Sequence, residues 1–131
     1  VVFLPMQPKH KMPAVWSLCN VALVHLKDSP AFAEVIPSKM FEAMAMGLPI
    51  LLSVPDGEAR EILDSHEAGL WVPPEDPAAL AEAVQNLAQD TDLLKRLSAN
   101  SLAAAPKHSR SVQADKMITV FEKALKDKGV G

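Results

Sequence analysis

The chain alternates short apolar runs with longer stretches in which apolar residues recur every three or four positions. Short apolar runs are typical of the buried strands of a parallel sheet, and the three-to-four spacing is typical of amphipathic helices. Strands are therefore predicted at residues 1–4, 21–26, 50–54 and 68–72. Helices are predicted at residues 9–18, 37–46, 58–65, 76–88, from Asp90 or Thr91 onward, and at 112–126.

Glycine and proline mark where these elements end. Gly47 is suited to the position just past the 37–46 helix, and Pro49 prevents the helix from continuing. Strands that alternate with helices over such short connections imply βαβ units. We therefore expect the α/β class, with a parallel sheet covered by helices on both faces. Residues 1–131 should form one domain, with 107–131 as its terminal helical segment.

Composition narrows the class of protein. The 131 residues are 49% hydrophobic, which is enough for one ordinary core. Thirteen Lys and Arg against sixteen Asp and Glu give a net charge of −3, which argues against a nucleic-acid partner. The single cysteine, Cys19, has no partner for a disulfide and is expected to be a buried packing residue in a reducing compartment. No run is long enough to span a membrane, so a cytoplasmic location is expected.

In a parallel sheet, ligands bind at the carboxyl edge of the strands. The informative loops are therefore those at residues 5–8, 27–36 and 55–57, each of which follows a predicted strand. We expect these loops to lie along one edge of the sheet.

Two glutamates separated by seven residues are the sharpest feature of the sequence. Glu34 precedes the 37–46 helix and Glu42 lies one turn into it, so both carboxylates could project over the same helix end. The first amides of a helix lack helical partners and form a ready phosphate site. Here these amides belong to Ser38, Lys39 and Met40. Because carboxylates accept hydrogen bonds from ribose and sugar hydroxyls, the combination fits a nucleotide sugar, with Lys39 offsetting charge.

Taken singly, the same residues have ordinary explanations. Glu42 alone would be a helix residue that favours the N-terminal dipole, and Glu34 alone a solvated loop carboxylate. The methionines of the 37–46 helix are expected to pack in the core. The histidines lie on separate elements without a carboxylate or cysteine at ligand spacing, so no metal site is expected at His10, His25, His66 or His108. His25 closes a strand at the presumed active edge, although a structural role is favoured.

The segment from Glu34 to Glu42, followed by Ala43-Met-Ala-Met-Gly-Leu-Pro-Ile50, resembles the donor-site signature of the family 4, or group 1, glycosyltransferases. The likeness continues through Ala68-Gly-Leu-Trp-Val-Pro-Pro74 and Asp76-Pro-Ala-Ala-Leu80 and covers the chain from about residue 1 to its end. It implies the C-terminal half of a GT-B enzyme built from two Rossmann-like domains. Such an enzyme transfers a glycosyl group with retention and without a metal or other cofactor, to an acceptor held by the N-terminal domain.

The resemblance also implies a role for each site residue. Glu34 would approach the donor sugar hydroxyls and be the catalytic carboxylate, and Glu42 would bind the ribose diol. The amides from Pro37 through Ser38 and Lys39 to Met40 would bind the diphosphate. Met6 and Gln7 stand where this family holds the base.

Two features of the sequence depart from, or refine, the family pattern. Val35-Ile36 stands where a glycine commonly follows the first glutamate, so the close backbone approach that glycine allows is missing. The Pro-Ser-Lys run at 37–39 resembles enzymes that transfer amino sugars from UDP donors in surface polysaccharide synthesis. The expected partners are therefore a UDP-sugar and an acceptor saccharide, which could be lipid-linked and bring the whole protein to a membrane.

Two alternatives stay open at this point. One is a nucleotide-sugar 2-epimerase of the same architecture, which normally uses histidine and acidic groups placed differently. The other is a catalytically silent binding module that has kept the fold. The family's basic pair, which neutralises the leaving diphosphate, normally precedes the first strand seen here. We therefore expect an N-terminally incomplete domain that binds without turnover. Because the predicted strand at residues 1–4 opens the chain without a polar lead-in, we also expect an incomplete sheet edge there.

Overall fold

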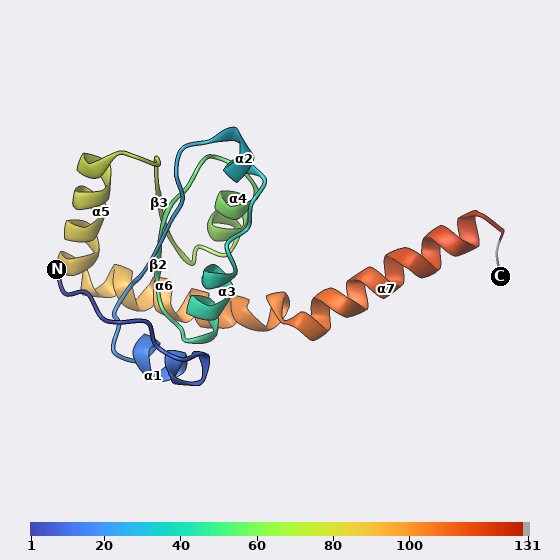
Figure 1. The fold of residues 1–131 in the computed structure, drawn as a ribbon, viewed down its shortest axis with the longest axis horizontal. Coiled ribbons are helices and arrows are strands. Elements are labelled where there is room, and N and C mark those ends of the chain that lie inside the picture. The colour runs from blue at the N-terminus through green and yellow to red at the C-terminus, as the bar shows by residue number, and fades with distance from the viewer. Residues whose placement is uncertain (130–131) are drawn as a thin grey trace.

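A sheet of three parallel strands forms the centre of the molecule (Figure 1). The computed structural model describes residues 1–129, so the last two residues of the segment predicted at 107–131 lie outside the described residues. The strands are β1 (Ala22–His25), β2 (Ile50–Ser53) and β3 (Gly69–Val72), in the order β1-β2-β3. The parallel register aligns the last residues of the strands, with Ser53 of β2 opposite both His25 and Val72. The strands predicted at 21–26, 50–54 and 68–72 are confirmed.

Helices cover both faces of this sheet. The described helices are η1 (Lys9–Lys11), α1 (Met12–Trp16), α2 (Pro30–Ala33), α3 (Ser38–Ala45), α4 (Glu58–Ser65), α5 (Pro77–Gln89), α6 (Thr91–Ala104), η2 (Ala105–His108) and α7 (Arg110–Asp127). Ile50 and Leu52 of β2 pack in one core cluster with residues of α3 and α4. Leu51, which points to the opposite face, packs with residues of α5 and α6. The predicted α/β fold with helices on both faces is confirmed.

The end of α3 is closed as the sequence predicts. Gly47 has a left-handed backbone with φ of 65°, and its N–H donates to the carbonyl of Met44 at 2.9 Å. The N–H of Leu48 reaches back to the carbonyl of Ala43 at 3.0 Å. This pair of bonds is the Schellman motif, in which glycine avoids the steric cost of a positive φ. Pro49 follows, and the chain enters β2 at once.

Two serines of α6 form hydrogen bonds to the residues that follow α3. The Ser98 hydroxyl donates to the carbonyl of Gly47 at 2.6 Å, and the Ser101 hydroxyl donates to the carbonyl of Leu48 at 2.7 Å. Ser101 is fully buried, so its hydrogen bond satisfies two polar groups that water does not reach. Helix α6 thereby holds α3 and β2 at the end of the sheet where the strands begin (Figure 1).

The strand predicted at residues 1–4 is wrong. The segment has no regular secondary structure, and even Leu4, its least exposed residue, is 67% exposed. An apolar run forms a strand only where a neighbouring strand supplies hydrogen bonds, and no described strand lies beside this one. The incomplete sheet edge predicted at residues 1–4 is therefore wrong as well, because the outer strands of the sheet are β1 and β3.

The helix predicted at 9–18 is shorter than its pattern. It forms as η1 followed by α1 and ends at Trp16, after which Leu18 is 83% exposed. Trp16 and Cys19 pack against the core cluster that contains residues of α3, which explains why these two apolar residues lie three positions apart. Cys19 is half-buried rather than buried, with its Sγ 3.5 Å from the carbonyl of Val15.

Helix α7 projects away from the body of the molecule (Figure 1). It confirms the helix predicted at 112–126, beginning two residues earlier and ending one residue later. From Gln113 to Asp127 every residue is exposed, including the apolar side chains. These are Met117, Ile118, Val120, Phe121 and Leu125. None of the described helices is long and apolar enough to cross a membrane.

Replacing the buried Ser101 by alanine should lower the free energy of unfolding by about 1–3 kcal/mol, because the Leu48 carbonyl would stay buried without a donor. Ser65→Ala is the matched control, since the Ser65 hydroxyl is exposed and bonds only to Ile62 of its own helix. Urea unfolding of the two variants measures the difference. Equal stability of Ser101→Ala and Ser65→Ala would contradict the role assigned to α6.

Candidate functional site

A hollow of about 260 Å³ lies between the end of β1 and the start of α3. We call it the α3 hollow. Its lining combines the strand end with the residues that open the helix, namely Leu23, Val24, His25, Leu26, Val35, Pro37, Ser38 and Lys39. The hollow lies at the carboxyl edge of the sheet, where ligands of parallel α/β folds bind. Three of the residues expected to bind a diphosphate therefore lie together.

The start of α3 presents free backbone donors to this hollow. Pro37 is the N-cap residue, in an extended conformation, and no side chain caps the helix. Within residues 1–129, the N–H groups of Ser38 and Lys39 form no hydrogen bond. Unpaired amides at a helix start, combined with the positive end of the helix dipole, favour an anion. The exposed Lys39 adds a positive charge beside them.

Met40 differs from its neighbours. Its N–H donates to the carbonyl of Pro37 at 3.0 Å, and its side chain is fully buried in the core. It does not line the α3 hollow. The backbone donors available at the start of α3 are therefore those of Ser38 and Lys39.

The two glutamates lie on either side of the helix start. Glu34 is the residue at which α2 ends, and Glu42 lies in the second turn of α3 on the side opposite the buried residues Met40 and Met44. Both side chains are exposed, and neither forms a hydrogen bond or ion pair with another described residue. They also lie outside the lining of the α3 hollow. Their carboxylates are thus free to accept hydrogen bonds from a ligand that extends beyond it.

Close backbone packing fixes the segment that carries Glu34. Gly57, in the turn between β2 and α4, lies against the carbonyl of Ala33, the residue before Glu34. A Cβ atom at position 57 would lie 2.3 Å from that carbonyl oxygen, which no side chain tolerates. The absence of a side chain at Gly57 is what lets the turn and α2 approach so closely.

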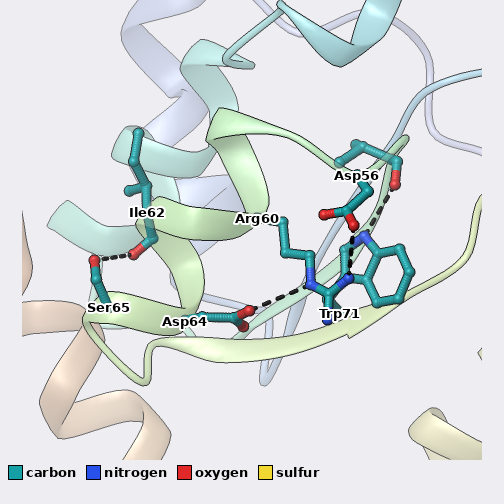
Figure 2. A network of polar contacts seen from close by, with 7 residues as sticks. Asp56, Arg60, Ile62, Asp64, Ser65 and Trp71 are labelled. Atoms are coloured by element: carbon teal, nitrogen blue, oxygen red, sulfur yellow. Dashed lines mark hydrogen bonds and ion pairs between the residues drawn. The ribbon is translucent and has the colours of Figure 1, made fainter. Parts of the chain in front are cut away.

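A polar network holds that turn in place (Figure 2). The Arg60 guanidinium pairs with Asp56 at 3.2 Å and with Asp64 at 3.3 Å, and it lies 3.9 Å from the centre of the Trp71 ring. The Trp71 indole N–H donates to the carbonyl of Val54 at 2.9 Å. A guanidinium over an aromatic face is an electrostatically favourable contact. The network thus links the end of β3 to the turn that supports Ala33.

His25 is a lining residue that sequence reasoning assigned to structure rather than to function. It ends β1 with an exposed side chain and lines the α3 hollow. It also lines a larger hollow of about 670 Å³ on the other side of the strand end, beside Glu75 and Pro77. Its position as the last residue of a strand at the carboxyl edge is the signal that could have placed it here.

Met6 and Gln7 are not brought to the α3 hollow. In the view of Figure 1 the N-terminus lies toward the end of α5 and the start of α6, whereas α2 lies at the opposite end of the sheet. Met6 is 98% exposed, and the Gln7 side-chain amide donates to the carbonyl of Pro5 in its own segment. In this structure the loop at 5–8 does not share an edge with the loops at 27–36 and 55–57.

The sequence of the chain matches the family model of glycosyl transferases group 1 over residues 1–103. This match spans most of the chain and includes β1, β2, β3 and the start of α3. The chain therefore belongs to the group 1 glycosyltransferase family.

Individual bacterial proteins are also similar to this chain. A D-inositol 3-phosphate glycosyltransferase of Nocardia farcinica is 28% identical over 95% of this chain and 26% of its own length. An exopolysaccharide phosphotransferase of Streptomyces coelicolor is 35% identical over 67% of this chain and 9% of its own length. An N,N'-diacetylbacillosaminyl-diphospho-undecaprenol alpha-1,3-N-acetylgalactosaminyltransferase of Campylobacter jejuni is 24% identical over 75% of this chain and 26% of its own length. The chain spans about a quarter, or less, of these relatives.

Gly57→Ala should displace α2 and Glu34, because the added methyl group would collide with the Ala33 carbonyl. The amides of Phe32 and Val35, which bond within this segment at 2.9 Å and 3.2 Å, should exchange faster with solvent. Amide exchange measured by NMR tests this, with Glu58→Ala as a control at the next residue, the exposed first position of α4. Unchanged exchange at Phe32 and Val35 in a folded Gly57→Ala variant would contradict the packing argument.

Proposed function

We propose that the chain is the donor-binding part of a retaining glycosyltransferase, which moves a glycosyl group from a nucleotide diphosphate sugar to an acceptor saccharide. One observation carries the proposal. Among the described residues, two unpaired amides and a lysine open α3, and two unpartnered carboxylates flank this opening along the chain, Glu34 just after α2 and Glu42 in the second turn of α3. Amides and positive charge suit a diphosphate, and carboxylates suit the neutral hydroxyls on both sides of it.

Each group then has a distinct role. The amides of Ser38 and Lys39, with Pro37 shaping the helix start, bind the diphosphate, and the Lys39 ammonium offsets its charge. Glu42 accepts hydrogen bonds from the ribose diol, and Glu34 accepts them from the donor sugar. The carboxylates avoid the diphosphate itself, because like charges in contact with it would repel it.

Catalysis in this scheme is electrostatic. The bond between the anomeric carbon and the diphosphate oxygen breaks, and negative charge develops on the departing diphosphate. The acceptor hydroxyl oxygen bonds to the anomeric carbon, and its proton passes to the departing diphosphate. Fixed N–H dipoles and a lysine aimed at that charge stabilise it more in the transition state than in the ground state. Glu34 positions the sugar for this transfer, and the acceptor is held by parts of the protein beyond this chain.

The donor and acceptor follow from chemistry and from the relatives. We favour a UDP-linked N-acetylaminosugar, because the Campylobacter jejuni relative transfers N-acetylgalactosamine and the Pro-Ser-Lys run at 37–39 opens α3. The same relative acts on a diphospho-undecaprenol saccharide, which makes a lipid-linked acceptor the natural candidate. Such an acceptor would bring the whole protein to a membrane surface.

Calorimetric titration of the chain with UDP and with UDP-N-acetylglucosamine separates the two carboxylates. Glu42→Ala should weaken both ligands about ten- to a hundredfold, because each loses hydrogen bonds to a charged acceptor. Glu34→Ala should weaken only the UDP-sugar, since UDP lacks the sugar hydroxyls. Parallel titrations with GDP and ADP identify the base.

Glu61→Ala is the control for this titration, because Glu61 is an exposed carboxylate on the neighbouring helix α4. It should leave both affinities unchanged. The donor-site assignment fails if Glu34→Ala weakens UDP as much as UDP-sugar, or if none of the nucleotides binds the chain joined to the rest of its protein.

A further inference from the structure

Two histidines from distant parts of the sequence meet outside the donor site. The Nε2 atoms of His66 and His108 lie 2.8 Å apart, although the residues are 42 positions apart in the chain. His66 directly follows α4 as its C-cap residue, and His108 is the last residue of η2. At this distance one Nε2 donates its proton to the lone pair of the other. The contact therefore needs at least one of the two imidazoles to keep an unprotonated Nε2.

A third segment completes the contact. The ring of Phe41, on α3, stacks on the His108 ring with centroids 5.0 Å apart and an interplanar angle of 23°. The His66 ring meets the same His108 ring edge-on, also at 5.0 Å. His108 is thus held between α3 and α4, the two helices that cover one face of the sheet.

This arrangement fixes where α7 begins. His108 is followed by Ser109, the N-cap of α7, whose hydroxyl accepts from the N–H of Val112 at 3.3 Å. Val112 is half-buried, and every residue of α7 beyond it is exposed. The described body of the molecule therefore holds α7 through η2 and its first turn. Ala105, at the start of η2, packs against the core cluster of α3 and α4. At the end of η2, the His66–His108 contact is the side-chain hydrogen bond that links it to this layer among the described residues.

The charges around the pair oppose further positive charge. Lys107 on η2 and Lys116 on α7 are the nearby cations. The Asp64 carboxylate of α4 is engaged by Arg60. Among the described residues, neither Glu67, which follows His66, nor Glu42, which follows Phe41, forms an ion pair with an imidazole. Protonation of both rings would place two positive donors face to face beside two lysines.

The lowered pKa values of both histidines also disfavour protonation of the two rings in the closed contact. Burial lowers the pKa of His66, and the charge of Lys107 lowers it further. Burial also lowers the pKa of His108, and the charges of His66, Lys116 and Lys107 add to the effect. A histidine whose folded pKa lies below its ordinary value of 6.5 binds fewer protons when folded than when unfolded. The contribution of each histidine to the stability of the folded state is therefore present above about pH 6.5, and it is lost as the pH falls toward the folded pKa.

A metal ion fits this pair less well than a proton does. Among residues 1–129 there is no group of three or more His, Cys, Asp or Glu side chains that could hold a metal. Lys107 and Lys116 would also repel a divalent cation.

We propose that the His66–His108 pair is a proton-operated latch, which docks η2 and the start of α7 on the body of the molecule at neutral pH. When both imidazoles are protonated, the shared hydrogen bond is replaced by two repelling donors, and η2 separates from Phe41 and His66. The donor-binding edge of the sheet takes no part in this step. The latch thus sets whether the apolar side of α7 is presented in a fixed direction.

Amide exchange of the full chain between about pH 7.5 and about pH 5 tests the latch, because that interval spans the ordinary titration of histidine. Protection factors, corrected for the intrinsic pH dependence of exchange, should fall at Ser109 and Val112 by about tenfold per pH unit for each proton taken up. Leu51 and Leu52 of β2 are the internal reference and should keep their protection. A metal-dependent change at constant pH would overturn the assignment to a proton.

Two variants sharpen the test, and each is first checked for folding by circular dichroism at neutral pH. His66→Gln removes one of the two titrating rings and should reduce the pH dependence at Ser109 and Val112 to that of His108 alone, at most about tenfold per pH unit. Lys107→Gln leaves both rings but removes a neighbouring cation, so opening should move to lower pH. His10→Gln, at an exposed histidine on η1, should behave as the unaltered chain. An unchanged pH dependence in His66→Gln overturns the latch. If His66→Gln does not fold, an unshifted opening in Lys107→Gln overturns it.

Discussion

The burial of β2 on both faces is the constraint on which the rest of the structure depends. Ile50, Leu51 and Leu52 are each no more than 2% exposed, and their side chains alternate between the two core clusters. A strand buried in this way requires helices above and below it, as parallel sheets generally do. Helix α3 meets that requirement on one side, and the connection that leads into it from β1 must then cross the carboxyl edge of the sheet. The start of α3 is therefore placed at the ligand edge by core packing rather than by any polar interaction.

The backbone of the loop between β1 and α3 is held in place by residues that lie outside the loop. Glu34 has no hydrogen-bonding partner among the described residues, yet its backbone follows Ala33, whose carbonyl is packed against Gly57. Gly57 is held in turn by the Arg60 and Trp71 contacts with Asp56 and Val54 (Figure 2). The side chains proposed to bind a ligand are thus left free, while their backbone is fixed by neighbouring residues. This division matches the general need for functional groups to be positioned by a supporting layer.

Much of this could be predicted from local patterns in the sequence. The extent of α3 followed from its content of good helix formers and from Gly47, which adopts the positive φ that this type of helix C-terminus needs. The apolar run at residues 1–4 failed because a hydrophobic pattern reports a tendency to be buried and does not supply a neighbouring strand. The same limit applies to α7, whose spacing predicted a helix but not whether its apolar side is covered. The His66–His108 contact depends on tertiary packing across 42 residues, so no local pattern could reveal it.

Helix α3 joins the donor-binding edge and the histidine pair, yet the two are mechanically separate. Its first residues open the α3 hollow, and Phe41 in its middle carries the stacking contact with His108. The helix cannot follow a movement of η2 easily, because Met40, Ala43 and Met44 are fully buried and its end is fixed by Gly47 and the serines of α6. Losing one face of an exposed or half-buried aromatic ring costs far less than moving three core residues. Acidification should therefore act on η2 and α7 and leave the opening of α3 in place.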